Sequence, residues 1–188
     1  MIENWFSVPI LYEDLFADVA KIQKEIELAL PKVKENNLEN PWQDNVLTTF
    51  KFGDYTNDIA NYNLNTLQGC IEKLAEYYLL KNSMEPRKLK IYNSWFNFYD
   101  KGMFQYDHTH QFAKLSGVYY YQTNGKDGDI IFSNPNIYLA ERLCDIGIPE
   151  VSYSPVVGRV LIFPSWLKHR VLLNKTDSQR ISISFNLK

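Results

Sequence analysis

The chain has 188 residues, a formal net charge of −2, 45% hydrophobic residues and 22% charged residues. These proportions are typical of a globular protein with a substantial core, and they exclude extensive disorder. Lys and Arg form no long block, so nothing in the sequence favours a nucleic-acid partner. No uncharged apolar run is long enough to span a bilayer, so a membrane role has no support.

The cysteines and the first residues bear on the location of the protein. Cys70 and Cys144 have no metal-ligand spacing, and the residues after Met1 lack the basic region of a signal peptide. We therefore expect reduced thiols and a cytoplasmic protein. No pattern in the sequence indicates the oligomeric state.

The first 86 residues favour helices accompanied by short strands. The expected elements are a strand at residues 5–11, a helix from residue 15 onward, a strand at 47–52 and a helix from 64 to about 82. We expect Glu13 and Asp14 in the first turn of the first helix, and we expect that helix to end at Pro31. Each helix has one apolar stripe, which is typical of cover over a core, and we assign neither any chemistry.

From residue 89 onward the hydrophobic period changes to two, which is typical of strands. The expected strands are residues 89–99, 115–122, 129–132, 157–163, 170–173 and 180–185. Only residues 136–144 could form a helix between them, so a parallel βαβ sheet is not expected. Many short strands in succession predict a sandwich or barrel. We expect one domain over residues 1–188, with a helical cover at 1–86 and a β core at 87–188.

The sequence contains three histidines, His108, His110 and His169. Imidazole is the commonest metal-binding side chain, and residues i and i+2 of a strand point to the same side of the sheet. A His-x-His pair with a distant third His is therefore a candidate metal site. Each histidine could instead fill an ordinary hydrogen-bonding position, and the pair alone does not decide between the two interpretations.

The last predicted strand has one polar and one apolar face. On its polar face, Arg180 offers a fork of donors that suits a carboxylate, and Ser182 projects beside it. The two form a candidate carboxylate clamp, although the polar face of an ordinary surface strand simply meets water. Asn97 and Tyr99 share a face of an earlier strand and could bind a small polar ligand.

Taken together, these segments resemble the Fe(II)/2-oxoglutarate-dependent oxygenases, and within them a small uncharacterised group found often in marine bacteria and phages. The resemblance rests on the order and spacing of motifs over about half of the chain. These motifs are Trp95–Gly102, His108–His110, Leu115–Tyr120, Val157–Ser165 followed by His169, and Arg180–Asn186. If a phage encodes the protein, the cytoplasm in question is that of its host.

The resemblance implies a mainly β fold, a double-stranded β-helix or cupin-like jelly roll with N-terminal covering α-helices. It also implies Fe(II) as the metal, 2-oxoglutarate as co-substrate and dioxygen as oxidant. By position, His108 and His169 are metal ligands, and Arg180 pairs with the far carboxylate of 2-oxoglutarate. The co-substrate-binding residues carried over in this way are Arg180, Ser182 and, on a looser match, Asn97 and Tyr99.

His110 departs from the superfamily, which usually has a carboxylate at this position. Three neutral imidazoles can still hold ferrous iron, and the group that the chain resembles has His-x-His here. Such a site carries one more positive charge than a site with a carboxylate ligand. Asp107 is expected on the opposite strand face from His108 and His110, so it cannot bind the same metal ion. We therefore expect Asp107, like Asn186, to contact the metal ligands or to lie outside the site.

The implied reaction oxidises a bound substrate while 2-oxoglutarate is decarboxylated to succinate, and it uses no catalytic side chain beyond the metal centre. The expected substrate is an amino-acid side chain, free or in a peptide or protein, or another small molecule, and the expected reaction is hydroxylation. Tyr119, Tyr121 and Trp166 are candidates for the substrate mouth, although aromatic residues in β-rich proteins are more often core.

Two alternatives stay open. A three-His jelly-roll dioxygenase would need no 2-oxoglutarate, and the clamp of Arg180 and Ser182 argues against it. A jelly roll without catalysis could act as a structural or interaction module, which would have no use for the three histidines and Arg180.

Overall fold

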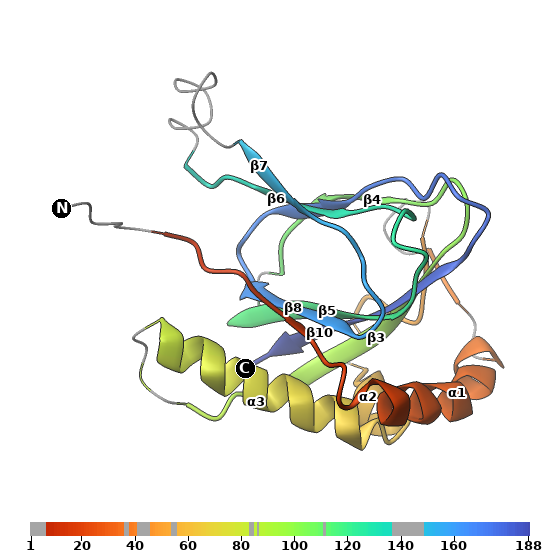
Figure 1. Ribbon diagram of the computed structural model, residues 1–188, viewed down its shortest axis with the longest axis horizontal. Coiled ribbons are helices and arrows are strands. Elements are labelled where there is room, and N and C mark those ends of the chain that lie inside the picture. The colour runs from red at the N-terminus through yellow and green to blue at the C-terminus, as the bar shows by residue number, and fades with distance from the viewer. Residues whose placement is uncertain are drawn as a thin grey trace.

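The computed structural model describes residues 7–35, 38–40, 46–53, 56–82, 85, 87–110, 112–136 and 149–188. Two antiparallel β-sheets face each other, and helices cover the outer side of one of them (Figure 1). This arrangement confirms the predicted mainly β jelly roll with N-terminal helical cover. The possible helix at 136–144 lies, apart from Asn136, outside the described residues.

The larger sheet has six strands in the order β1-β8-β5-β10-β3-β2. Their bounds are β1 (Leu11–Asp14), β2 (Leu47–Thr48), β3 (Ile91–Tyr99), β5 (Leu115–Gln122), β8 (Arg159–Pro164) and β10 (Arg180–Leu187). The C-terminal strand β10 is central, because it pairs antiparallel with β3 on one side and with β5 on the other. The motif segments that lie in β3, β5 and β10 are therefore neighbours in one sheet.

The smaller sheet has the order β4-β9-β6-β7. Its strands are β4 (Gln105–His108), β6 (Ile130–Ser133), β7 (Glu150–Tyr153) and β9 (His169–Val171). The sequence did not predict β4 and β7, since these two short edge strands are largely exposed and lack a buried apolar face. In the pairing of β4 with β9, His108 lies opposite His169.

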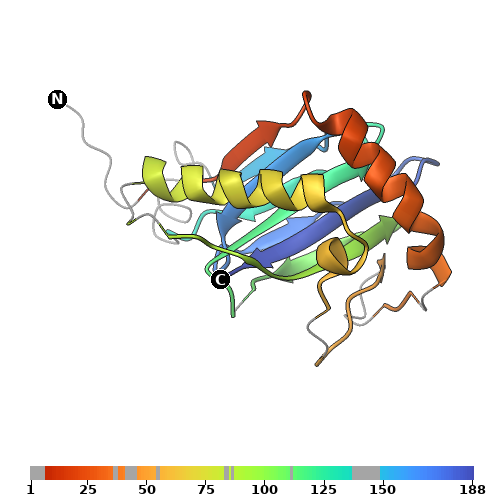
Figure 2. The ribbon, with the colours of Figure 1, turned by 90° about the horizontal axis from the view of Figure 1, so that it is seen from below.

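Helices α1 (Val19–Glu35) and α3 (Asn65–Lys81) cross the outer face of the larger sheet, and the short helix α2 (Asp58–Asn61) precedes α3 (Figure 2). Ile22 and Ile26 of α1, Ile71 of α3 and Ile183 of β10 are all fully buried in one apolar cluster. Burial of such a side chain contributes about 1.5–3 kcal/mol. The helices thus cover one face of the larger sheet, and its other face is turned toward the smaller sheet.

The prediction that α1 ends at Pro31 was wrong, because the helix continues to Glu35. A proline inside a helix removes the hydrogen bond to the carbonyl four residues earlier, here that of Glu27. Both Glu27 and Pro31 are exposed, so water can satisfy this carbonyl, while Val33 in the next turn is fully buried. Packing of Val33 therefore outweighs the lost bond.

Of the strand predicted at residues 5–11, residues 5 and 6 lie outside the described residues, residues 7–10 form no strand, and β1 runs from Leu11 to Asp14 and includes Glu13. Asp14 lies opposite Arg159 in the sheet, and the guanidinium donates to both of its carboxylate oxygens at 2.7 and 2.9 Å. This bidentate ion pair holds the two acidic residues in a strand, so the prediction that they belong to the first helical turn was wrong.

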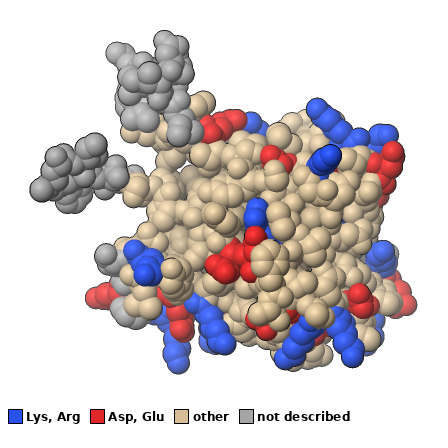
Figure 3. Space-filling model, in the orientation of Figure 1, with Lys and Arg blue, Asp and Glu red and all other residues tan. Residues whose placement is uncertain are grey.

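The surface carries charges of both signs. On the face shown in Figure 3, Lys and Arg side chains are interspersed with Asp and Glu side chains. Such a mixed surface gives no electrostatic argument for a nucleic-acid partner. Within the described ranges, no helix combines the length and the apolar composition needed to cross a membrane.

Candidate active site

A cavity of about 360 Å³ has walls from both sheets. Strands β3, β5, β8 and β10 of the larger sheet and β4, β6 and β9 of the smaller sheet contribute to its lining, together with residues 50, 52–53 and 112–113. All three histidines and Arg180 line this one space. Its volume lies in the range of small-molecule sites, which is roughly 300–1,000 Å³.

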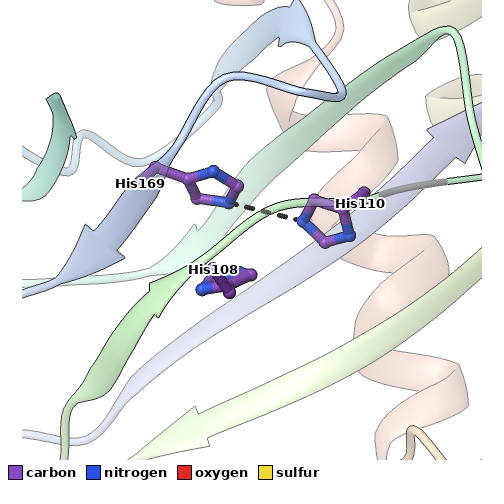
Figure 4. A group of neighbouring side chains, drawn as sticks. All are labelled: His108, His110 and His169. Carbon is purple, nitrogen blue, oxygen red and sulfur yellow. Dashed lines mark hydrogen bonds between the residues drawn. The ribbon is translucent and has the colours of Figure 1, made fainter. Parts of the chain in front are cut away.

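Two of the three histidines lie on neighbouring strands, and the third follows the end of one of these strands (Figure 4). His108 ends β4, His110 follows two residues later, and His169 begins β9. Their candidate ligand nitrogens all lie within 4.8 Å of one another, and Nε2 of His110 is 3.3 Å from Nε2 of His169. Two nitrogens bound at right angles to one ion, each at about 2.1 Å, are about 3 Å apart. The cluster therefore fits a shared metal ion.

Backbone carbonyls fix the orientation of two of these rings. Nδ1 of His108 lies 2.8 Å from the carbonyl oxygen of Tyr106, and Nδ1 of His169 lies 2.8 Å from that of Leu167. Because a carbonyl oxygen only accepts hydrogen bonds, each Nδ1 carries the proton and donates it. When such a ring is neutral, its Nε2 keeps a lone pair for a metal.

Burial keeps the rings of His110 and His169 uncharged at neutral pH. It lowers the pKa of His110 to about 3, with the neighbouring His108 as a second cause. Burial also lowers the pKa of His169 well below its ordinary value, assisted by His108 and His110 and opposed by the hydrogen bond to Leu167. At neutral pH both rings are in the form that binds metals. Two neutral nitrogens that face each other at 3.3 Å suit a cation between them.

Asp107 lies outside this cluster. Its carboxylate is 3.4 Å from Nζ of Lys168 and 3.7 Å from Nη1 of Arg170. Because neighbouring residues of a strand point to opposite faces, Asp107 and His108 are directed to different sides of the smaller sheet. Among the described residues, the group of potential metal ligands contains three imidazoles and no carboxylate.

Arg180 is buried to 1% exposure in the same cavity. Its Nη1 donates to the carbonyl of Asp127 at 3.1 Å and to the carbonyl of Gly128, and its Cζ lies 4.0 Å from the ring centroid of Tyr99. Its Nε has no hydrogen-bond partner among the described residues. No carboxylate of the described residues lies at ion-pair distance from the guanidinium. Burying a cation without a counter-ion is costly, so this position suits an anionic ligand.

The loop before β6 supplies the carbonyls that hold Arg180. The hydroxyl of Thr123 donates to the carboxylate of Asp127 at 2.7 Å, and the backbone N–H of Asn124 donates to it at 2.9 Å. Gly128 has a φ of +103°, and a Cβ atom there would collide with the carbonyl of Leu172. Only glycine meets both conditions, so the loop conformation that positions the guanidinium depends on it.

The other predicted co-substrate residues lie near Arg180, but not all of them line the cavity. Ser182 and Tyr99 line the cavity, and the Tyr99 hydroxyl donates to Oε1 of Gln105 at 3.1 Å. Asn97 lies opposite Ser182 in the sheet but is not part of the lining. The buried Oδ1 of Asn97 has no hydrogen-bond partner in the described chain. Asn186 lines the cavity at a different point, opposite Asn93 of β3.

The structure does not bring the three predicted aromatic residues of the substrate mouth to the cavity. Tyr119 and Tyr121 are buried in the apolar cluster between the larger sheet and the helices. Tyr120 lines the cavity instead, because successive side chains of β5 alternate between the two faces. Trp166 is 56% exposed and lies outside the lining.

Several cavity residues were missed from the sequence. Asn93 has the strand parity of Asn97, and Ser184 lies on the polar face of the last strand, so both carried a signal. Phe50 and Phe112 line the cavity from irregular segments, in which no periodicity indicates the direction of a side chain.

The family model described as "Putative 2OG-Fe(II) oxygenase" matches residues 93–186, which is half of the chain. No curated protein matches the sequence significantly. Similar solved folds include a prolyl-4-hydroxylase from Pseudomonas putida, with 15% identity, a TM-score of 0.63, and coverage of 97% of this chain and 93% of that one. HygX from Streptomyces hygroscopicus, solved with nickel and 2-oxoglutarate, has 13% identity, a TM-score of 0.62, and coverage of 96% and 82%.

The epimerase SnoN from nogalamycin biosynthesis, described as α-ketoglutarate-dependent, has 15% identity, a TM-score of 0.68, and coverage of 96% and 78%. At these identities the structural likeness shows the fold. The family model adds the chemistry, because the segment that it matches contains all three histidines and the buried arginine. Fold, cavity and family model agree, and the chain belongs to the 2OG-Fe(II) oxygenases, an enzyme family.

Proposed function

We propose that the protein is an Fe(II)- and 2-oxoglutarate-dependent oxygenase that hydroxylates an amino-acid side chain, free or within a peptide or protein, or another small molecule. His108, His110 and His169 hold the iron, and Arg180 with Ser182 binds the far carboxylate of 2-oxoglutarate. Iron and 2-oxoglutarate supply the activation of dioxygen. One oxygen atom enters the new C–OH group and the other enters succinate, while 2-oxoglutarate loses CO₂.

The observation that carries this proposal is the presence of a buried guanidinium in the same cavity as three imidazoles. A metal site alone needs no second cation, whereas a dianionic co-substrate needs a cation for each of its two ends. The Nε of Arg180, which has no partner among the described residues, offers the additional donor that a carboxylate would use. A three-His dioxygenase without 2-oxoglutarate leaves this arrangement unexplained.

The remaining residues orient the ligands and exclude water. Tyr99 packs against the Arg180 guanidinium and limits its movement. Phe132 and Phe163 pack against the ring of His169, with centroid distances of 5.7 and 4.8 Å. These apolar rings exclude water, and a lower local dielectric constant strengthens the interactions of charged groups in the cavity. Hydroxylation as the reaction type is supported by the similar fold of an enzyme named as a prolyl-4-hydroxylase.

The test is an anaerobic titration of the Fe(II)-loaded protein with 2-oxoglutarate. The proposal predicts the weak visible absorption band of an Fe(II)–2-oxoglutarate chelate and, after air is admitted, release of succinate. Arg180→Ala should weaken the binding of 2-oxoglutarate and leave iron bound. Arg87→Ala, which removes an exposed arginine, is the matched control. Absence of both the band and succinate would contradict the proposal and favour one of the two alternatives.

A further inference from the structure

The cavity has a second polar end, distinct from the end at Arg180. Arg180 and Asn186 both lie on the inward face of β10, six residues apart, which corresponds to about 20 Å along a strand. In the neighbouring strand β3, Tyr99 lies opposite Arg180 and Asn93 lies opposite Asn186. The two ends of the cavity therefore present different chemistry, a guanidinium at one and a pair of carboxamides at the other.

His110, a proposed metal ligand, packs against the larger sheet between these two ends of the cavity. The ring of His110 lies 5.8 Å from the ring of Trp95, and Trp95 lies opposite Ser184 in the sheet. Ser184 is two residues from Asn186 and four from Arg180. A co-substrate that extends from the metal toward Arg180 thus leaves the carboxamide end open to another molecule.

The carboxamides belong to a hydrogen-bond chain that starts at the hydroxyls of Ser165 and Ser116, which lie 2.8 Å apart. Ser116 donates from Oγ to Oδ1 of Asn186 at 2.6 Å, and Nδ2 of Asn186 donates to Oδ1 of Asn93 at 2.9 Å. The chain ends at Nδ2 of Asn93, which donates to no residue that the structure describes, although Asn93 is only 6% exposed and lines the cavity. This end of the cavity therefore offers an N–H donor to a ligand with a hydrogen-bond acceptor.

The surroundings of this donor are aromatic. Phe50 packs edge-on against Trp95 at 5.1 Å and against Phe52 at 5.6 Å. Phe52 and Phe112 line the cavity and yet are 68% and 76% exposed, so they form apolar surface at its rim. Exposed aromatic side chains beside a cavity are typical of surfaces that bind a larger partner.

The charge of the cavity lining favours a residue within a peptide over a free amino acid as substrate. Among the described lining residues there is no Asp, Glu or Lys, and Arg180 is the formally charged one. A free amino acid would bring an ammonium group into a space lined by three imidazoles and a guanidinium, without an anionic partner among these residues. A residue inside a peptide chain brings neutral carbonyl acceptors instead.

We propose that Asn93, oriented by Asn186 and Ser116, binds a backbone carbonyl of a peptide, and that the substrate is a residue within a peptide or protein. Phe52 and Phe112 contact the flanking residues of that peptide. This inference rests on the proposed function, because it concerns the substrate of the same oxygenase site, and it excludes the free amino acid that the proposed function allows.

The test measures succinate release by the Fe(II)-loaded full chain with 2-oxoglutarate in air. One set of probes is N-acetylated, C-amidated pentapeptides that differ only in the central residue, and the other is the corresponding free amino acids. We expect at least one peptide to raise succinate release about tenfold or more and to gain one oxygen atom by mass spectrometry. Stimulation by free amino acids, or by neither set, overturns the inference. Absence of the anaerobic chelate band would instead contradict the proposed function.

A pair of variants tests the role of Asn93. Asn93→Asp replaces the N–H donor with a carboxylate, and we expect the KM for the stimulating peptide to rise by about tenfold or more, since the peptide carbonyl then faces an acceptor and loses its donor. The chelate band in this variant shows whether its metal site has formed. Asn61→Asp adds the same charge at an exposed position of α2 and should retain the wild-type KM. An unchanged KM in Asn93→Asp overturns the inference.

Discussion

The two faces of β10 are both largely buried, yet they differ in how their side chains are satisfied. Ile181, Ile183, Phe185 and Leu187 face the helices, and Arg180, Ser182, Ser184 and Asn186 face the cavity. The side chains of the first set are apolar and pack in a continuous cluster, where the buried Tyr119 hydroxyl has no hydrogen-bond partner among the described residues. In the second set, Arg180 is a buried cation whose Nε lacks a partner among the described residues. Burial and an unsatisfied polar atom therefore do not separate core from site, whereas a buried formal charge without a counter-ion does.

The largest effect on stability is expected on the helix-facing side. Phe185 is fully buried, and its truncation to Ala should lower the free energy of unfolding by about 3–5 kcal/mol because a cavity remains. Denaturant unfolding measures this change. Phe16→Ala, at a side chain that is 71% exposed, is the control and should change stability by less than about 0.5 kcal/mol. Equal effects of the two variants would remove the distinction between the faces.

On the cavity side, loss of a polar group should weaken ligand binding more than it weakens the fold. Arg180→Met keeps most of the side-chain volume and removes the charge, so the affinity for 2-oxoglutarate should fall by about 30-fold or more, as for other truncated charge pairs. Isothermal titration with the Fe(II)-loaded protein measures this affinity. The unfolding free energy of the ligand-free protein should fall by less, because the guanidinium has no carboxylate partner among the described residues. The opposite ranking would assign Arg180 a structural role.

His110 distinguishes a three-imidazole site from a two-imidazole one. His110→Ala should lower the affinity for Fe(II) by about tenfold or more. His110→Asp should bind Fe(II) more tightly than His110→Ala, because it supplies the carboxylate ligand that is usual in the superfamily. Competition with a chromogenic chelator measures both affinities. Identical iron affinity in His110→Ala and the wild type would place His110 outside the ligand set.

The smallest expected effect is on stability at alkaline pH, through Tyr78 in the helix-facing cluster. Burial raises the pKa of Tyr78 to about 12, whereas its value in the unfolded chain is 10.0. Between these values the unfolded chain has lost the proton that the folded chain keeps, so the contribution of Tyr78 to stability is complete below pH 10 and falls as the pH rises. Tyr78→Phe should therefore reduce the alkaline loss of stability in thermal unfolding. Tyr77→Phe, at a neighbouring exposed residue, should leave that loss unchanged.

The sequence predicted those features of the fold that depend on local periodicity. The alternation in residues 180–187 indicated a strand with two distinct faces, and the apolar stripe from Leu64 to Tyr78 predicted α3 closely. Features set by distant partners were not predictable in this way. β1 lies where it does because Asp14 pairs with Arg159, and α1 continues past Pro31 because Val33 packs in the core.

The same division applies to the candidate site. The His-x-His spacing and the polar face of the last strand lie within single segments, so the sequence alone could indicate them. The direction of Tyr120 depends on how β5 sits in the sheet, and the free donor of Asn93 depends on contacts with Ser116 and Asn186 in other strands. Tertiary contacts of this kind carry no signal in local periodicity.

We propose that three imidazoles, and no carboxylate of the protein, hold the iron. X-ray absorption spectroscopy of the anaerobic Fe(II)-loaded protein at neutral pH counts imidazole ligands through their multiple-scattering signal. We expect three imidazoles in the wild type, also after addition of 2-oxoglutarate, and two in His110→Ala. Two imidazoles in the wild type, with an unchanged spectrum in His110→Ala, would show that His110 does not hold the iron.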